Sequence, residues 1–167
     1  MRRNVWSYVL VMMGVMVCAH PVFADPPAGY PFLRFDNALK VAKEQNKKIL
    51  VYYGRYGCGY CDKTNKESFS DPVLRKLYIE HYVLTYVDAE SGQRLTLPTG
   101  EQVTEMELGA RLKAVVTPVF IYMDSEGQPL LKVPGFQTAH DLRRYDRYIY
   151  GGFYTKKTLA EYLAQNP

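Results

Sequence analysis

Two cysteines separated by two residues, Cys58 and Cys61, are the residues of this sequence whose type and spacing point to chemistry. They lie in the segment Gly57-Cys58-Gly59-Tyr60-Cys61, which follows an apolar run and precedes a segment of helical periodicity. A cysteine at a helix N-terminus lies beside unpaired backbone N–H groups and at the positive end of the helix dipole, and both favour the thiolate. The second cysteine, one turn further along, is within disulfide reach of the first. The pattern predicts thiol–disulfide exchange in which Cys58 attacks and Cys61 resolves the mixed disulfide.

Two other uses of the cysteine pair remain open. A purely structural disulfide is one, although a bridge between Cys58 and Cys61 closes so short a loop that it restrains the unfolded chain very little. A zinc site is the other, but such a site takes four ligands. His81 and His140, the histidines after residue 24, stand at no recognised zinc-finger spacing. We therefore expect no metal, and no cofactor other than the redox-active cysteine pair itself.

The N-terminal segment has the pattern of a secretory signal. Arg2 and Arg3 precede an apolar stretch at 5–19, and small residues then lead to Ala24. A charged start, an apolar core of about 7–15 residues and a small-residue exit are what signal peptidase requires. We predict that residues 1–24 are a signal peptide, cleaved after Ala24, and that the protein is periplasmic.

Three alternatives to a cleaved signal are weaker. An uncleaved membrane anchor would need about 20 apolar residues. A lipoprotein attached through Cys18 would need a small residue where Val17 stands. A buried N-terminal helix of a cytosolic protein would show a polar face, which this run lacks.

The composition is that of a globular domain. The chain has 167 residues, of which 47% are hydrophobic and 23% charged, so it is too apolar for a disordered protein. Its net charge of +4 is far from the dense basic surface of a nucleic-acid binder, and we expect no nucleic-acid partner. The length predicts one domain, at 35–167, behind a proline-rich extended lead-in at 25–34. We expect a monomer.

Hydrophobic periodicity predicts the elements that must position the cysteines. Strands are expected at 49–53, 82–87, 115–123 and 130–133, with a loop or small hairpin at 89–103. Helices are expected at 35–48, from Cys58 with a restart at Ser70-Asp71-Pro72, at 104–113, from Thr138, and from Thr155 to about 164. Asp36, Thr104 and Thr155 are the predicted N-caps, and Glu107 completes a capping box with Thr104. This order indicates an α/β fold with a mixed sheet of about four strands flanked by helices.

These motifs together resemble the thioredoxin superfamily. The resemblance rests on the strand–Cys-x-x-Cys–helix arrangement and on Thr117-Pro118 before an apolar strand, and it covers nearly all of residues 35–167. The Cys-Gly-Tyr-Cys box, with Phe-Ser-Asp-Pro at 69–72, looks most like exported SoxW-like thioredoxins. The same box, with a threonine before the proline, is also similar to the catalytic domain of DsbC-type disulfide isomerases.

The resemblance implies roles for several residues. It implies a cis peptide bond at Thr117–Pro118 beside the cysteines, with Thr117 pairing through its backbone to an extended substrate strand. Tyr60 is expected to be exposed and to touch substrates along with Thr117 and Pro118, while Gly57 and Gly59 shape the active-site loop.

The activity that the resemblance implies is thiol–disulfide exchange with protein thiols and disulfides in the periplasm, in the reducing direction. Reduction there needs a membrane electron donor, because the compartment supplies no reducing pool. A disulfide oxidase or isomerase, and a non-catalytic module that captures a partner strand, are the alternatives.

The sequence departs from the family pattern at three places. Tyr52 stands where ordinary thioredoxins carry a buried aspartate that helps to deprotonate the deeper cysteine. Gly57 stands where they usually carry tryptophan, which predicts a smaller substrate platform. The lead-in at 25–34 is too short for the dimerisation domain of DsbC-type isomerases, which disfavours that activity.

Overall fold

The structure, a computed structural model, describes residues 26–166. The predicted signal peptide, residues 1–24, and its cleavage position lie outside the described residues. The strands are β1 (Lys48–Gly54), β2 (Tyr82–Asp88), β3 (Arg94–Thr96), β4 (Gln102–Thr104), β5 (Val119–Met123) and β6 (Pro129–Pro134). The helices are α1 (Phe35–Gln45), α2 (Gly59–Lys63), α3 (Pro72–His81), α4 (Glu105–Arg111), α5 (Ala139–Tyr150) and α6 (Leu159–Gln165), with a π-helical turn at Thr64–Ser68 and a 3-10 turn at Phe153–Thr155.

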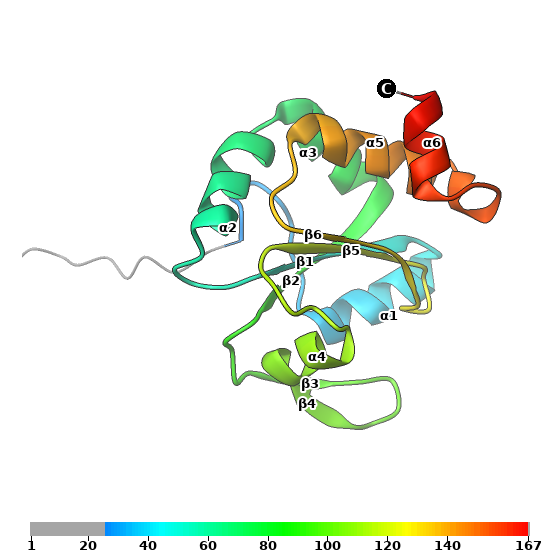
Figure 1. Ribbon diagram of the computed structural model, residues 1–167. Coiled ribbons are helices and arrows are strands. Elements are labelled where there is room, and N and C mark those ends of the chain that lie inside the picture. The colour runs from blue at the N-terminus through cyan, green and yellow to red at the C-terminus, as the bar shows by residue number, and fades with distance from the viewer. Residues whose placement is uncertain (1–25, 167) are drawn as a thin grey trace, which may run out of the picture.

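The main sheet has four strands in the order β2-β1-β5-β6 (Figure 1). β1 runs parallel to β2 and antiparallel to β5, and β5 runs antiparallel to β6. Ile49 in the central strand β1 therefore lies opposite Val83 on one side and Met123 on the other. A strand that is paired on both edges and covered on both faces has a continuous run of apolar residues, and β1 has such a run. The predicted α/β class, with a mixed four-stranded sheet flanked by helices, is confirmed.

Each face of the sheet buries its own hydrophobic core. Helices α1 and α4 and the β3–β4 hairpin cover one face, whereas α3 and α5 cover the other (Figure 1). Successive side chains of β1 alternate between them, so that Tyr53 belongs to the α1 core and Tyr52 to the α3 core. The α3 core is rich in aromatic rings: the Tyr52 ring stacks on Phe120 at a centroid distance of 5.4 Å. This packing fixes the floor of the site described below.

The lead-in packs against the domain. Tyr30 is 8% exposed and donates a hydrogen bond from its hydroxyl to the carbonyl oxygen of Phe69 at 3.0 Å. Leu33 forms a parallel bridge with Thr85 at the edge of β2. The predicted lead-in is thus seated on the sheet edge and on the aromatic core.

Two predicted helix starts differ from the structure. α1 begins at Phe35 with Arg34 as its N-cap residue, so the prediction that Asp36 is the N-cap was wrong. The Asp36 carboxylate instead accepts hydrogen bonds from the Arg34 guanidinium at 2.8 Å and from the backbone N–H of Thr96 at 3.4 Å. The predicted capping box of α4 is confirmed, since Thr104 and Glu107 each bind the backbone N–H of the other.

The last helix starts later than predicted. Thr155 lies in the 3-10 turn and is not an N-cap of α6. Thr158 is the N-cap, and it forms a capping box with Glu161. Of these two threonines, Thr158 is followed three residues later by glutamate and Thr155 is not, so only Thr158 can form a capping box.

β5 begins at Val119, and not at residue 115 as predicted. Pro118 has no N–H group to donate to a neighbouring strand, which ends the ladder there. The residues before it leave the sheet, and Val115 is 88% exposed and Val116 48% exposed. No helix of the described part of the chain combines the length and the apolar character that a membrane crossing requires.

Candidate active site

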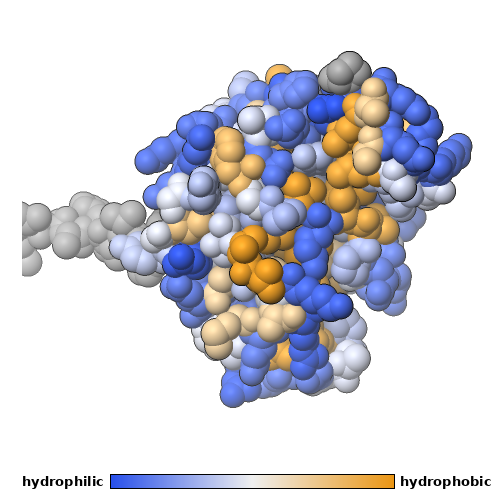
Figure 2. Space-filling model, in the orientation of Figure 1, coloured by the Kyte–Doolittle hydropathy of each residue, from blue (hydrophilic) through white to orange (hydrophobic). Residues whose placement is uncertain are grey.

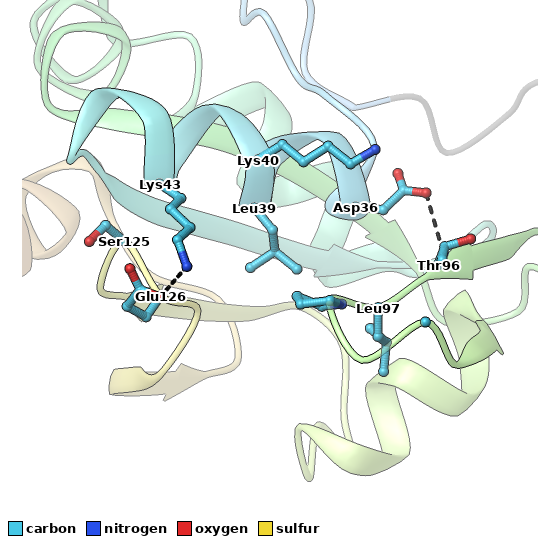
Figure 3. A pocket seen from close by; sticks show the side chains of 10 residues that line it. Asp36, Leu39, Lys40, Lys43, Thr96, Leu97, Ser125 and Glu126 are labelled. Atoms are coloured by element: carbon cyan, nitrogen blue, oxygen red, sulfur yellow. Dashed lines mark hydrogen bonds and ion pairs between the residues drawn. The ribbon is translucent and has the colours of Figure 1, made fainter.

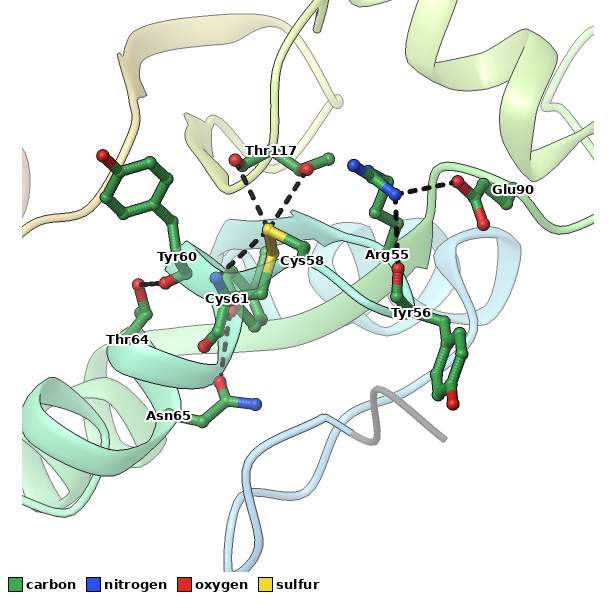
Figure 4. Close-up of a disulfide and its surroundings, with 10 residues drawn as sticks. Arg55, Tyr56, Cys58, Tyr60, Cys61, Thr64, Asn65, Glu90 and Thr117 are labelled. Carbon is green, nitrogen blue, oxygen red and sulfur yellow. Dashed lines mark hydrogen bonds and ion pairs between the residues drawn. A yellow bond between two sulfur atoms is a disulfide. The ribbon is translucent and has the colours of Figure 1, made fainter. Parts of the chain in front are cut away.

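Cys58 and Cys61 lie at the start of helix α2, a few residues after the end of the central strand β1. β1 ends at Gly54, and the chain turns through Gly57, whose φ of +63° is a conformation that glycine adopts without strain. Cys58 is the N-cap residue of α2, and Cys61 is one turn inside it. The two cysteines form a disulfide with a Cα–Cα distance of 5.2 Å (Figure 4). The predicted cysteine pair is therefore at bonding distance in the described structure.

The sulfur of Cys58 has two hydrogen-bond donors. The backbone N–H of Cys61 donates to Sγ of Cys58 at 3.1 Å. The Thr117 hydroxyl donates to the same sulfur at 3.3 Å, and the Thr117 carbonyl oxygen lies 3.5 Å from it. In the reduced protein these donors favour the thiolate of Cys58, because a hydrogen bond to the charged form stabilises that form.

The segment that carries Thr117 leads into β5, the strand that pairs with β1. The peptide bond between Thr117 and Pro118 is cis, and Pro118 is buried whereas Thr117 is partly exposed. The structure thus brings four of the predicted site residues together: the two cysteines from α2 and these two residues from the start of β5.

The backbone of Cys61 contacts the side chain of a buried tyrosine, Tyr52. Tyr52 is fully buried, and its hydroxyl donates to Oδ1 of Asn65 at 3.1 Å and lies 3.4 Å from the carbonyl oxygen of Cys61. Burial raises the pKa of Tyr52 well above its ordinary value of 10.0. The phenol is therefore protonated at neutral pH, so it acts as a hydrogen-bond donor and not as a base.

The buried carboxylates of residues 26–166 are Glu105 and Asp146, and both bind groups other than the cysteines. Glu105 accepts from the backbone N–H of Asp88 at 3.3 Å, and Asp146 lies 2.8 Å from Nδ1 of His81. Neither of these two buried carboxylates therefore contacts the cysteines.

A π-helical turn continues α2 and presents Asn65 to Tyr52. The turn spans Thr64–Ser68, and it is closed by the hydrogen bond from the N–H of Phe69 to the carbonyl oxygen of Thr64. Thr64 is fully buried and donates from its hydroxyl to the carbonyl oxygen of Tyr60 at 2.7 Å. π-Turns are frequent at functional sites. Sequence reasoning missed Thr64 and Asn65, because hydrophobic periodicity does not separate a π-turn from an α-helix.

The rim of the site is aromatic and basic. Figure 4 shows Tyr60 on one side of the contact between Cys58 and Thr117 and Arg55 on the other. Tyr60 is 65% exposed, and Arg55 forms an ion pair with Glu90 at 3.1 Å. Tyr60 thus offers a ring to whatever approaches Cys58, as its predicted contact with substrates requires.

The histidines considered as zinc ligands are engaged elsewhere. His81 bonds to Asp146 and stacks on the Tyr150 ring at a centroid distance of 3.5 Å. His140 lies 3.8 Å from Asp141. Among the described residues there is no group of three or more His, Cys, Asp or Glu side chains arranged to hold a metal ion.

A separate cavity of about 400 Å³ lies between α1, the β3–β4 loop and the β5–β6 turn. Figure 3 shows Leu39 pointing toward Leu97 across it, with the ion pair of Lys43 and Glu126 at one end. None of the predicted site residues lines this cavity. The cysteine pair, and not the presence of a cavity, therefore identifies the candidate active site.

Comparison with known proteins agrees with this geometry. The sequence matches the family model described as a thioredoxin-like domain over residues 35–150. A search of curated protein sequences found no match.

Among solved structures, a thioredoxin-fold protein from Helicobacter pylori is 22% identical with a TM-score of 0.61, over 72% of this chain and 80% of that one. A thioredoxin from Thermus thermophilus is 20% identical with a TM-score of 0.58, over 72% and 86%. A DsbH oxidoreductase is 18% identical with a TM-score of 0.55, over 71% and 83%. At these identities the likeness establishes the fold. The predicted membership of the thioredoxin superfamily is confirmed: the chain belongs to the thioredoxin-like domain family, and its Cys58–Cys61 pair at disulfide distance makes it a thiol–disulfide oxidoreductase.

Proposed function

We propose that this protein reduces disulfide bonds of exported proteins in the periplasm, acting as a monomer. The observation that carries the exchange chemistry of this proposal is the environment of the Cys58 sulfur, which receives hydrogen bonds from the Cys61 N–H and from the Thr117 hydroxyl. These donors stabilise a thiolate, and the thiolate is the nucleophile of disulfide exchange. Electrons pass through the cysteine pair itself, so the proposal requires no bound cofactor.

The reaction takes two exchanges. The Cys58 thiolate attacks one sulfur of a client disulfide, and the client S–S bond breaks as the bond between Cys58 and the client forms. The released client sulfur takes a proton from solvent. Cys61 then loses its proton, attacks Sγ of Cys58 and displaces the second client sulfur. The client has gained two electrons, and the protein ends as the Cys58–Cys61 disulfide of the structure.

Export and the reducing direction rest on the sequence. The pattern of residues 1–24 is that of a secretory signal, and the Cys-Gly-Tyr-Cys box resembles that of exported thioredoxins. A reductase in that compartment must be reduced again by a dithiol donor at the membrane, because no soluble reducing pool exists there. The oxidised pair accepts two electrons from such a donor by the same exchanges in reverse.

Reduction of insulin disulfides by the purified protein tests the exchange. We expect turnover with wild-type protein and a dithiol donor, and loss of turnover in Cys58→Ser. Cys61→Ser leaves Cys58 bonded to its client, so mixed disulfides accumulate, and the double variant that lacks both sulfurs collects none. Unimpaired biological function of Cys58→Ser would instead support a binding module without turnover.

Thiol alkylation of cells at steady state tests the direction. A reductase is held mainly as the dithiol, so both cysteines are alkylated when cells are quenched in acid. A pair found mainly as the disulfide contradicts the reducing direction and favours an oxidase. Cell fractionation with a periplasmic marker tests the location.

A further inference from the structure

We infer that Lys132, a lysine on the edge strand β6, is a positioning residue for the Cys58 sulfur: its ammonium group binds the C-terminal end of α4 and thereby fixes the place of the Thr117 hydroxyl. The inference rests on the proposed function, in which Cys58 attacks as a thiolate, and adds a residue that acts on that thiolate through Thr117. It depends neither on the direction of electron flow nor on the compartment.

The Lys132 ammonium binds main-chain oxygens of another segment. Lys132 lies opposite Ile121 in the pairing of β6 with β5, and Ile121 belongs to the core beneath α1 and α4. The Lys132 side chain therefore lies on the face that α4 covers, because directly paired residues of neighbouring strands share a face. There it donates hydrogen bonds to the carbonyl oxygen of Leu112 and, at 3.4 Å, to that of Lys113. Lysines ordinarily keep the ammonium in water, whereas this residue is partly buried.

Helix α4 ends in a strained turn. The N–H of Lys113 donates to the carbonyl oxygen of Ala110 at 3.0 Å, and the N–H of Ala114 donates to that of Gly109 at 2.9 Å. These two bonds form a Schellman motif, in which the residue at the position of Lys113 is left-handed and usually glycine. The φ of Lys113 is +52°, a conformation that costs free energy for a residue with a Cβ atom. The last carbonyl groups of a helix have no partner within it, and a cation there meets the negative end of the helix dipole, so the Lys132 ammonium stabilises this turn.

Strand β6 holds both ends of the segment that carries Thr117. At one end Lys132 binds the C-terminal end of α4, and at the other the backbone N–H of Gly135 donates to the carbonyl oxygen of Pro118 at 2.7 Å. The two valines that precede Thr117 are 88% and 48% exposed, and Figure 2 shows hydrophobic side chains at the surface over this segment. The middle of the segment is thus little buried, and the place of Thr117 depends on the two ends.

The contact between Thr117 and Cys58 is sensitive to the place of this segment. The two residues come from different elements, Cys58 from the start of α2 and Thr117 from the residues before β5 (Figure 4). The Thr117 hydroxyl donates to Sγ of Cys58 at 3.3 Å, and a hydrogen bond weakens as its distance and angle depart from the optimum. Without the Lys132 contact we expect the end of α4 to relax, Thr117 to shift and the Cys58 thiolate to lose part of its stabilisation.

Alkylation of Cys58 in the reduced, full chain tests the inference. The rate with iodoacetamide is measured from pH 5 to pH 9 in proteins that carry Cys61→Ser, so that only Cys58 reacts, and the midpoint of the profile reports the pKa of the thiol. Lys132→Met keeps the apolar stem and loses the ammonium, so we expect the rate near pH 7 to fall about fivefold and the midpoint to move to higher pH. Lys132→Arg keeps the charge and the donors and should restore the wild-type profile.

A double-mutant cycle separates positioning from the loss of a positive charge. If Lys132 acts through the Thr117 hydroxyl, Lys132→Met lowers the rate little further in a protein that already carries Thr117→Val. A direct effect of the charge on Cys58 would lower the rate by the same factor in both proteins. Lys76→Met, which changes an exposed lysine of α3, is the matched control and should react as wild type does. Urea unfolding of each variant verifies that it is folded.

The outcomes distinguish this inference from the proposed function. A Lys132→Met profile equal to that of wild type overturns the inference, as does a decrease of equal size with and without the Thr117 hydroxyl. Both results concern variants only and leave the reactivity of wild-type Cys58 as measured. A wild-type Cys58 that titrates as a free thiol, with a midpoint at about pH 8.5, contradicts the proposed function itself.

Discussion

Tyr52 and Cys61 are in contact beneath the disulfide: the buried phenol oxygen lies 3.4 Å from the carbonyl oxygen of Cys61 and donates to Asn65 at 3.1 Å. Ordinary thioredoxins carry an aspartate at this position. A carboxylate there can take the proton of the deeper thiol, whereas a phenol whose pKa is raised by burial cannot do so at neutral pH. The proton of Cys61 must therefore pass to another group or to water before the mixed disulfide is resolved.

Tyr52→Phe tests this relationship. The variant keeps the ring that stacks on Phe120 and loses the hydrogen bond to Asn65, so we expect the free energy of unfolding to fall by about 1 kcal/mol. The resolution rate of a preformed mixed disulfide should keep its wild-type dependence on pH between pH 6 and 9, because the phenol does not titrate there. A variant that loses an ionisation in this range would show that Tyr52 acts as the base after all.

The hydroxyl of Thr117 is expected to stabilise the Cys58 thiolate. Thr117→Val keeps the branched shape and removes the donor, which lies 3.3 Å from Sγ. A hydrogen bond to a charged group contributes about 1.5–3 kcal/mol, so the rate of Cys58 alkylation by iodoacetamide near pH 7 should fall about tenfold. Thr117→Ser keeps the hydroxyl and is the matched control, expected to react as wild type does. Equal rates for all three proteins would exclude the hydroxyl as a thiolate donor.

Local signals made much of the fold predictable. Asp71-Pro72 predicts the start of α3, where the Asp71 side chain accepts a hydrogen bond from the N–H of Leu74. Thr104 and Glu107 predict the start of α4. The apolar run of β1 followed by a Cys-x-x-Cys box led to the position of the site. These features depend on residues that are neighbours in sequence, and periodicity and capping report such neighbours directly.

Features built from distant residues were not predictable in this way. Asp36 has the residue type of an N-cap, yet Arg34 and Thr96 draw its carboxylate into other hydrogen bonds. His81 shows no partner in the sequence, because Asp146 reaches it only when α5 packs on α3. Tertiary contacts decide both cases, and a single sequence does not contain them as a pattern.

Asp71 joins the cap of α3 to helix α5, and its contribution to stability should depend on pH. The backbone N–H of Leu74 and the Arg143 guanidinium, at 2.7 Å and 2.6 Å, hold the pKa of Asp71 below its ordinary value of 3.8. A carboxylate whose pKa is lower in the folded state stabilises that state above the unfolded pKa, and the contribution is lost as the pH falls through the folded pKa. The stabilisation is therefore complete near pH 7 and declines below about pH 4.

Asp71→Ala removes the cap, and we expect a loss of about 1 kcal/mol at pH 7, measured by urea unfolding. The difference from wild type should shrink at pH 3, where the native carboxylate begins to be protonated. Glu44→Gln, which removes one negative charge from an exposed position of α1, is the control variant. A difference for Asp71→Ala that stays constant down to pH 2 would contradict the linkage.

Gly109 is required by the close approach of α4 to the central strand. A Cβ atom built on Gly109 would overlap the hydroxyl and ring carbons of Tyr53. Replacing glycine by alanine inside a helix ordinarily stabilises it by about 1 kcal/mol. Here the overlap reverses the sign, and Gly109→Ala is expected to lower the free energy of unfolding by about 1–3 kcal/mol.

Gly59→Ala is the matched control for this change. The added Cβ meets no atom within 4 Å, so Gly59→Ala is not expected to lower the free energy of unfolding. Urea unfolding of both variants measures the difference. A Gly109→Ala protein as stable as wild type would mean that α4 and Tyr53 can move apart to admit the added Cβ atom.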